Sequence, residues 1–222
     1  MAKVKNGLIS GKMGNLIYYV QDGIQYSRAV SAKPTKPATL NQAQYREKMA
    51  ITSKFLHKFK RVIKVGWHDP DSKRKYYSNA MSYHLHNAII EIKNEDNTNT
   101  DKKKKNQFQI DLTKVLLSSG NIESPKILSV LKNENQLDIT WDTRLGPITN
   151  RFTDILAIIA YKKDKIAEPF FSVGTRKMGT ASISLPFEMK EKIHVWAFYW
   201  NPTESDSEKN TVASDSVYLG EL

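Results

Sequence analysis

The chain has 222 residues, a formal net charge of +11 and no cysteine. The lack of cysteine excludes disulfide frameworks, thiolate metal sites and cysteine nucleophiles. With 40% hydrophobic and 10% aromatic residues, the chain can bury a core, so wholesale disorder is not expected. No apolar run approaches the roughly 18 residues of a membrane span, and no secretory signal follows Met1. We therefore expect a cytoplasmic protein.

The positive charge is concentrated in the first third of the chain. Residues 1–66 hold 13 Lys or Arg against only Asp22 and Glu47, a net charge of +11, whereas residues 67–222 hold 21 charges of each sign. Such segregation creates a local positive field that attracts nucleic acid or acidic protein surfaces. The alternative is a solvated surface whose lysines only keep the chain soluble.

The N-terminal segment has the pattern of a β-hairpin. Residues 16–20 and 24–30 are rich in β-branched and aromatic side chains, and Asp22 and Gly23 between them accept the positive φ angles of a type I′ turn. The glycines at 11–14 indicate a further turn rather than a phosphate cradle, because the P-loop pattern is absent.

Two amphipathic helices are predicted next. Thr39 and Gln42 match a capping box, and apolar residues at steps of three and four predict one long helix over residues 40–64 whose other side is basic. The same spacing predicts a second helix over residues 73–92. His84 lies on its apolar stripe, so we expect a packed, hydrogen-bonded core histidine rather than a metal ligand.

The second half of the chain has the pattern of a β-sandwich. The polar stretch over residues 94–105 predicts a mobile loop or domain boundary. From residue 107 the period becomes strand-like, and residues 193–200 should form a central strand because both alternating faces are apolar apart from His194. The candidate strands are 108–117, 127–131, 136–141, 152–161, 169–173, 180–185, 193–200 and 212–219.

The expected fold class is therefore α+β. It comprises an N-terminal β-hairpin with two amphipathic helices in a domain over residues 1–100. A C-terminal antiparallel sandwich of the immunoglobulin or fibronectin type III kind follows over residues 107–222.

Several strings together resemble an uncharacterised domain-of-unknown-function family abundant in Bacteroidota genomes, over essentially the whole chain. They are Gly11-Lys12-Met13-Gly14-Asn15, Thr39-Leu40-Asn41-Gln42-Ala43-Gln44, the helix of residues 79–89 and the ending at residues 214–221. The resemblance implies this organisation of basic hairpin, helices and sandwich, and it implies no catalytic residue.

No sequence signature of an enzyme is present. The nucleophile elbow, the zinc-binding helix and the dinucleotide fingerprint are all missing, and nothing selects a pair of carboxylates for glycoside hydrolysis. We therefore expect no enzyme, no cofactor, no metal site and no small-molecule substrate. A carbohydrate-acting hydrolase on the sandwich is the remaining enzymatic alternative.

These patterns predict a non-enzymatic binding or assembly protein whose basic N-terminal portion docks on an acidic protein surface or a polyanion. The sandwich would mediate interaction or self-association, giving a homo-oligomer that could serve as a subunit of a virion or appendage. The alternative is a nonspecific nucleic-acid-binding protein that contacts phosphates. Side chains expected to contact the partner are Lys12, Arg28, Lys33, Lys36, Arg46, Lys54, Lys58 and Arg61. Side chains that could stack on bases are Tyr18, Tyr19 and Tyr26.

Overall fold

The computed structural model describes most of the chain. The described residues are 3–5, 7–21, 23–32, 37–67, 76–92, 108–133, 135–144, 151–163, 165–185, 192–202 and 212–222. The chain divides into two compact units, Met1–Gln42 and Ala43–Leu222, and each is described by itself.

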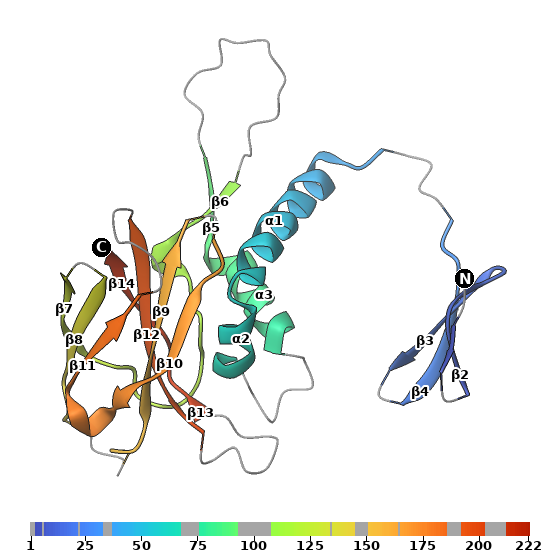
Figure 1. The fold of residues 1–222 in the computed structure, drawn as a ribbon. Coiled ribbons are helices and arrows are strands. Elements are labelled where there is room, and N and C mark those ends of the chain that lie inside the picture. The colour runs from blue at the N-terminus through green and yellow to red at the C-terminus, as the bar shows by residue number, and fades with distance from the viewer. Residues whose placement is uncertain are drawn as a thin grey trace, which may run out of the picture. The chain divides into compact units, whose positions relative to one another are not determined.

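The N-terminal unit contains one antiparallel sheet, drawn in blue in Figure 1. Its strands pair in chain order and are β1 (Lys3–Lys5), β2 (Leu8–Met13), β3 (Leu16–Gln21) and β4 (Ile24–Ala29). The two predicted strands are β3 and β4, but the expectation of a two-stranded hairpin is wrong, because β1 and β2 extend the sheet beyond β3.

Glycines make the tight turns of this sheet possible. Gly7 lies between β1 and β2 with φ 74°, Gly14 lies between β2 and β3 with φ 59°, and Gly23 lies before β4 with φ 79°. A Cβ at any of the three would meet no atom within 4 Å, so the requirement is for the left-handed backbone rather than for space. Asp22, the other residue of the predicted turn, lies outside the described residues.

The long predicted helix is divided in two. Its first part, α1 (Leu40–His57), begins at the predicted capping box: the Thr39 N–H donates to Oε1 of Gln42 (3.2 Å), and the Gln42 N–H donates to Oγ1 of Thr39 (3.3 Å). The second part, α2 (Lys60–Gly66), begins after Phe59, which has φ −108° and ψ 14°. The Phe59 side chain is buried in the core, so packing overrides the continuous helical period at this residue.

The third helix is shorter than predicted. It is α3 (Tyr76–Asn87), and residues 73–75 lie outside the described residues. After it the chain forms β5 (Ile89–Glu91), which pairs with β6 (Phe108–Ile110) in a separate two-stranded sheet. Pairing with a distant strand thus replaces the last predicted turn of helix.

The remaining strands form two antiparallel sheets. The five-stranded sheet contains β9 (Ile155–Lys162), β10 (Glu168–Thr175), β12 (Ile193–Asn201), β13 (Val212–Ala213) and β14 (Val217–Glu221). The three-stranded sheet contains β7 (Ile127–Asn133), β8 (Gln136–Trp141) and β11 (Thr180–Ser184). Residues 193–200 are confirmed as central, since β12 pairs with β9 on one side and with β13 and β14 on the other.

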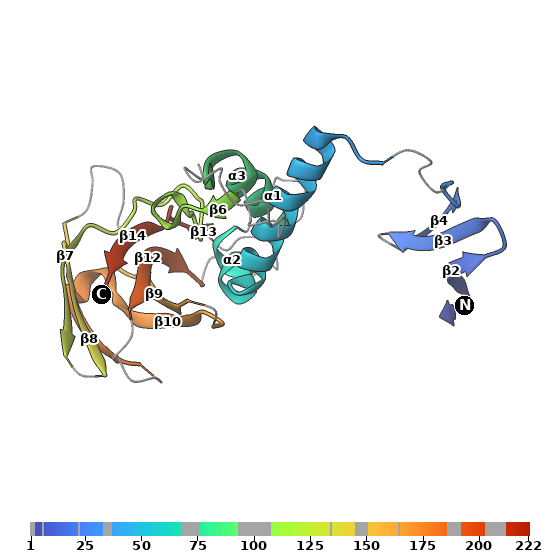
Figure 2. The same cartoon turned by 90° about the horizontal axis from the view of Figure 1, so that it is seen from above.

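The five-stranded sheet is covered on both faces, with helices on one side and the smaller sheet on the other (Figures 1 and 2). One face packs on β8, and the side chains of this core include Leu137, Ile139, Trp141, Leu156, Ile158, Val195 and Ala197. The other packs on α1 and α2, and this core includes Phe55, Leu56, Phe59, Ile63, Ile159, Tyr161, Trp196 and Phe198. Because β9 and β12 are buried on both faces of the sheet, their sequences do not alternate between apolar and polar residues.

The predicted α+β class is therefore wrong. Among the described residues the protein is mostly β, with four sheets and three helices. The helices supply one layer of the core of the C-terminal unit, which accounts for the division of the chain at residues 42 and 43. The boundary expected between residues 100 and 107 lies outside the described residues. No described helix is long and apolar enough to cross a membrane.

Candidate functional site

One face of the N-terminal sheet gathers four of the predicted partner-binding and stacking residues. Side chains paired directly across an antiparallel ladder project from the same face, and successive residues alternate. Lys12 pairs with Ile17 and Ile17 with Arg28, so these three form one cross-strand row. Tyr19 pairs with Tyr26 in the next row of the same face. We call this surface, defined by these five residues, the tyrosine face.

The tyrosine face is open to solvent. Tyr19 is 39% exposed and Tyr26 is 43% exposed, and their rings stack with centroids 5.6 Å apart and 20° between the planes. Lys12 and Arg28 are exposed on either side of Ile17. The face therefore combines an aromatic pair with two cations, and among the described residues neither cation forms an ion pair.

The opposite face of the sheet carries no charged side chain in the paired segments 11–13, 16–21 and 24–29. Tyr18 lies on this face, so the structure separates it from Tyr19 and Tyr26. Leu16 and Val20 are each 39% exposed there. All the charge of these segments is thus on the tyrosine face.

The predicted basic residues of the helices lie in the C-terminal unit. Arg46 and Lys54 on α1 and Arg61 on α2 are exposed and form no ion pair among the described residues. Lys58 differs, because its Nζ donates to the Tyr161 hydroxyl at 2.9 Å and it is half-buried. The remaining two predicted contacts, Lys33 and Lys36, lie outside the described residues.

A cluster of titratable side chains lies beside Lys58 on the five-stranded sheet. His194 Nδ1 is 2.8 Å from the Tyr218 hydroxyl, and His194 Nε2 is 3.9 Å from Oε2 of Glu221. The ring of Tyr161 stacks beside His194 with centroids 6.2 Å apart. Burial lowers the pKa of His194, and the charge of Glu221 partly opposes this. Sequence reasoning missed the cluster, since strand pairing alone brings its members together.

His84 is confirmed as a packed histidine. It is fully buried, its Nδ1 is 2.7 Å from the Ala80 carbonyl oxygen, and the Leu116 N–H donates to its Nε2 at 3.3 Å. An Nε2 that accepts a hydrogen bond carries no proton, so the ring is neutral with its proton on Nδ1. Burial lowers the pKa of His84, and the hydrogen bond to Ala80 partly offsets this effect.

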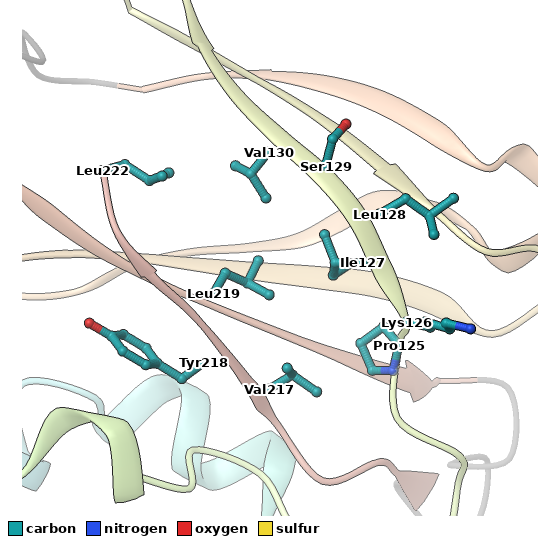
Figure 3. A pocket seen from close by; sticks show the side chains of 10 residues that line it. All are labelled: Pro125, Lys126, Ile127, Leu128, Ser129, Val130, Val217, Tyr218, Leu219 and Leu222. Carbon is teal, nitrogen blue, oxygen red and sulfur yellow. The ribbon is translucent and has the colours of Figure 1, made fainter.

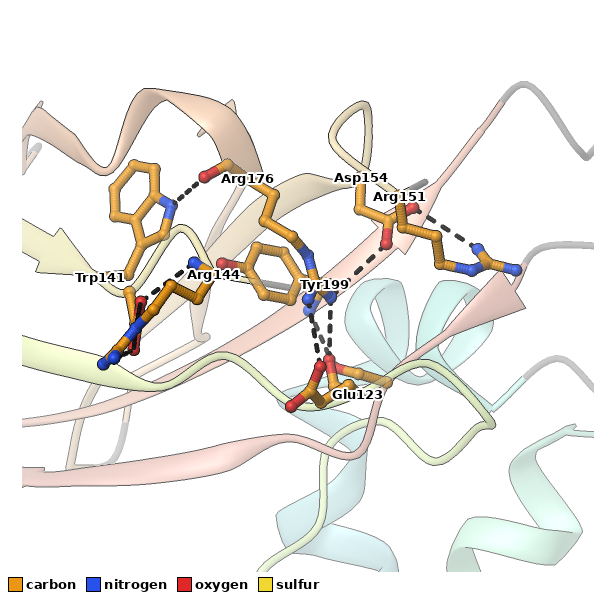
Figure 4. A network of polar contacts seen from close by, with 9 residues as sticks. Glu123, Trp141, Arg144, Arg151, Asp154, Arg176 and Tyr199 are labelled. Carbon is orange, nitrogen blue, oxygen red and sulfur yellow. Dashed lines mark hydrogen bonds and ion pairs between the residues drawn. The ribbon is translucent and has the colours of Figure 1, made fainter. Parts of the chain in front are cut away.

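A buried arginine cross-links the sandwich (Figure 4). The Arg176 guanidinium lies 3.6 Å from Oδ2 of Asp154 and 3.6 Å from Oε2 of Glu123, and its centre is 4.1 Å from the ring centroid of Tyr199. The backbone carbonyl of Arg176 accepts a hydrogen bond from Nε1 of Trp141 at 3.0 Å. The side chain of Arg176 is 3% exposed, so these groups compensate a charge removed from water.

The Asp154 carboxylate of this network is also buried. Burial raises the pKa of Asp154, whereas hydrogen bonds and charges from Asn201, Arg151 and Arg176 lower it. Burial also raises the pKa of Tyr199 to about 12. The groups come from segments far apart in the chain and are held by one another, which is the arrangement of a structural cross-link.

An apolar cleft of about 560 Å³ lies between β7 and β14, along one side of the sandwich (Figure 3). Ile127 and Val130 line it from β7, and Val217 and Leu219 line it from β14. None of the predicted site residues lines this cleft. Among the described residues, no group of three or more His, Asp or Glu side chains could hold a metal ion.

Comparison with known proteins gives one result for almost the whole chain. A family model described as "Family of unknown function (DUF6266)" matches residues 8–220, from the second strand of the N-terminal sheet to the last strand of the sandwich. No curated protein matches the chain. Because the match covers far more than half of its residues, the chain belongs to the Family of unknown function (DUF6266).

Proposed function

We propose that this chain is a non-enzymatic binding or assembly protein whose N-terminal sheet docks on an acidic protein surface through the tyrosine face. The observation that carries the proposal is the sorting of side chains on that sheet. Lys12 and Arg28 share a face with the exposed Tyr19–Tyr26 pair, and the opposite face is uncharged.

The architecture of the N-terminal unit supports a docking role. A sheet buries a hydrophobic face against a second layer in nearly all stable domains. The described strands of Met1–Gln42 form a single sheet, and β4 is exposed along its whole length. Such a sheet gains stability by covering a face with a partner.

The composition of the tyrosine face favours a protein partner. Tyrosine and arginine are enriched among the residues that contribute most to protein interfaces, because both combine a large contact area with hydrogen-bonding groups. Residues 1–42 hold six Lys or Arg against Asp22 alone, so the partner's surface should be acidic. Nucleic acid is the second candidate, and the exposed tyrosine pair supports it because bases stack on aromatic rings.

The test measures the affinity of the full chain for immobilised poly-L-glutamate at about 50 and 200 mM salt. We expect affinity to fall with salt and Lys12→Glu/Arg28→Glu to weaken binding at least about tenfold. The matched control Lys132→Glu/Lys177→Glu makes the same charge change on the sandwich and should bind like wild type. Equal affinity of the two variants would overturn the proposal.

A second arm separates the two partner classes. A fluorescent oligothymidylate is titrated with wild type and with Tyr19→Ala/Tyr26→Ala. Tighter binding of the oligonucleotide than of poly-L-glutamate, lost in the tyrosine variant, would favour nucleic acid. Weaker binding that is indifferent to the tyrosines supports the protein partner.

A further inference from the structure

Strand β4 forms an open edge of the N-terminal sheet. Among the described strands it pairs only with β3, and all six of its residues are exposed. The other edge is β1, which is only three residues long. Short edge strands resist pairing with other chains, whereas a longer exposed edge offers a template for an added strand.

The hydrogen-bond pattern identifies which backbone groups of β4 point outward. In an antiparallel pair, alternate residues exchange bonds with the partner strand. The Val30 N–H donates to the Asn15 carbonyl at 2.8 Å, so even-numbered residues face β3. The N–H and C=O groups of Gln25, Ser27 and Ala29 therefore point away from the sheet.

We infer that the outward edge of β4 binds an extended acidic peptide segment by strand addition, with main-chain bonds to Gln25, Ser27 and Ala29. This inference rests on the proposed function, because it specifies how the acidic partner is held. A strand placed beside β4 would lie about 4.8 Å away and pair its side chains with those of β4.

Charge decides the occupant of the edge. The added strand would present alternate side chains beside Ile24, Tyr26 and Arg28 on the tyrosine face. A carboxylate there can pair with Arg28, which forms no ion pair among the described residues. A second copy of the sheet would instead bring a segment of the same positive charge, which is unfavourable.

The probe is the capped octapeptide of four Glu-Val repeats, which places glutamate on one face of a strand and valine on the other. Amide exchange of the full chain is followed residue by residue by NMR as the peptide is added. We expect exchange to slow at least about tenfold at Gln25, Ser27 and Ala29. Exchange should change little at Tyr26 and Arg28, whose N–H groups are already bonded to β3.

Ser27→Pro separates strand addition from charge attraction. Proline removes an outward N–H but no bond to β3, a position at which edge strands tolerate it. We expect this variant to lose at least about tenfold in peptide affinity, and Ser27→Ala to bind like wild type. Unchanged exchange at Tyr19 and Tyr26 would show that the proline variant keeps its sheet. If the proline variant loses its sheet, two N-methylated forms of the peptide replace it, one methylated at the glutamates and the other at the valines. We expect one of the two forms to lose binding, because its methyl groups block the N–H groups that would bond to β4.

The outcomes distinguish this inference from the proposed function. Salt-dependent binding of poly-L-glutamate with no slowed exchange at Gln25, Ser27 and Ala29 overturns strand addition and leaves the docking proposal standing. No binding of either probe overturns both. Protection of the same three amides without peptide, rising with protein concentration, would make a second copy the occupant and overturn the acidic-peptide assignment.

Discussion

The rings of Tyr19 and Tyr26 stack across β3 and β4, with their centroids 5.6 Å apart. Cross-strand aromatic pairs add about 0.5–1.5 kcal/mol beyond the area they bury. We predict that Tyr26→Ala lowers the free energy of opening of β3 and β4 by more than this amount, because the substitution also removes the area that the ring buries; native-state amide exchange measures the loss. Tyr18→Ala is the control, because Tyr18 lies on the opposite face and stacks on no ring among the described residues. A loss below about 0.5 kcal/mol in Tyr26→Ala would contradict a contribution from the stack.

Phe59 joins the helices to the five-stranded sheet. Its ring centroid lies 5.0 Å from that of Tyr161 and 5.9 Å from that of Trp196. Removing such a buried ring costs about 3–5 kcal/mol, so Phe59→Ala should lower the denaturation midpoint substantially.

Tryptophan fluorescence measures this effect, because all four tryptophans lie after residue 43. Amide exchange in β3 and β4 should stay unchanged in Phe59→Ala, since those strands belong to the other unit. A shift of only the helical circular dichroism, with the tryptophan transition unmoved, would contradict a shared core.

The neutral, buried His84 makes stability depend on pH. Its pKa is lowered on folding, so between that lowered value and about 6.5 the folded chain binds fewer protons than the unfolded chain. The contribution of His84 is present above pH 6.5 and is lost as pH falls toward the folded pKa. Its slope is at most about 1.4 kcal/mol per pH unit.

Urea denaturation between pH 5 and 8 tests this prediction. We expect His84→Gln to flatten the pH dependence, although the variant is less stable at every pH. His57→Gln removes an exposed histidine and should keep the wild-type slope. If the free energy of unfolding of His84→Gln depends on pH as steeply as that of wild type, another titrating group causes the pH dependence.

The cross-link of Arg176 gives a stability prediction with an internal check. Arg176→Met leaves the buried Asp154 without this cation and should cost about 3–5 kcal/mol. The double variant Asp154→Leu/Arg176→Met should recover part of the loss, because no buried carboxylate is then left without the charge of Arg176. Arg144→Met, which removes an ion pair whose arginine is exposed to solvent, is expected to cost at most about 1 kcal/mol. A double variant no more stable than Arg176→Met would contradict the charge argument.

The sequence predicted elements whose signal is local. Residues 193–200 are apolar on both alternations, and this pattern identified a central strand. Asp22 and Gly23 between two β-rich runs identified β3 and β4. Thr39 and Gln42 identified the start of α1.

Other features depend on contacts between distant residues. Strand β1 has only three residues, and β2 contains Gly11 and lies between Gly7 and Gly14, so periodicity did not indicate them. The helix break at Phe59 follows from its packing on Tyr161 and Trp196, which lie more than a hundred residues later in the chain. Lys58 was expected to face a partner, but its bond to the Tyr161 hydroxyl could not be read from the sequence.

The placement of the candidate site residues on the two faces of the N-terminal sheet also depends on strand pairing. Alternation places Tyr18 and Tyr19 on opposite faces once the strand is assigned. Lys12 lies on the same face as Tyr19 because β2 pairs with β3, and the predicted two-stranded hairpin did not include β2.

The central claim is that the N-terminal sheet holds the partner. Its most direct test is hydrogen exchange of the full chain, followed by mass spectrometry, with and without poly-L-glutamate at low salt. We predict that protection is confined to peptides covering residues 7–32. Protection confined to peptides of the helices or the sandwich, such as residues 46–64 or 127–141, would contradict the account.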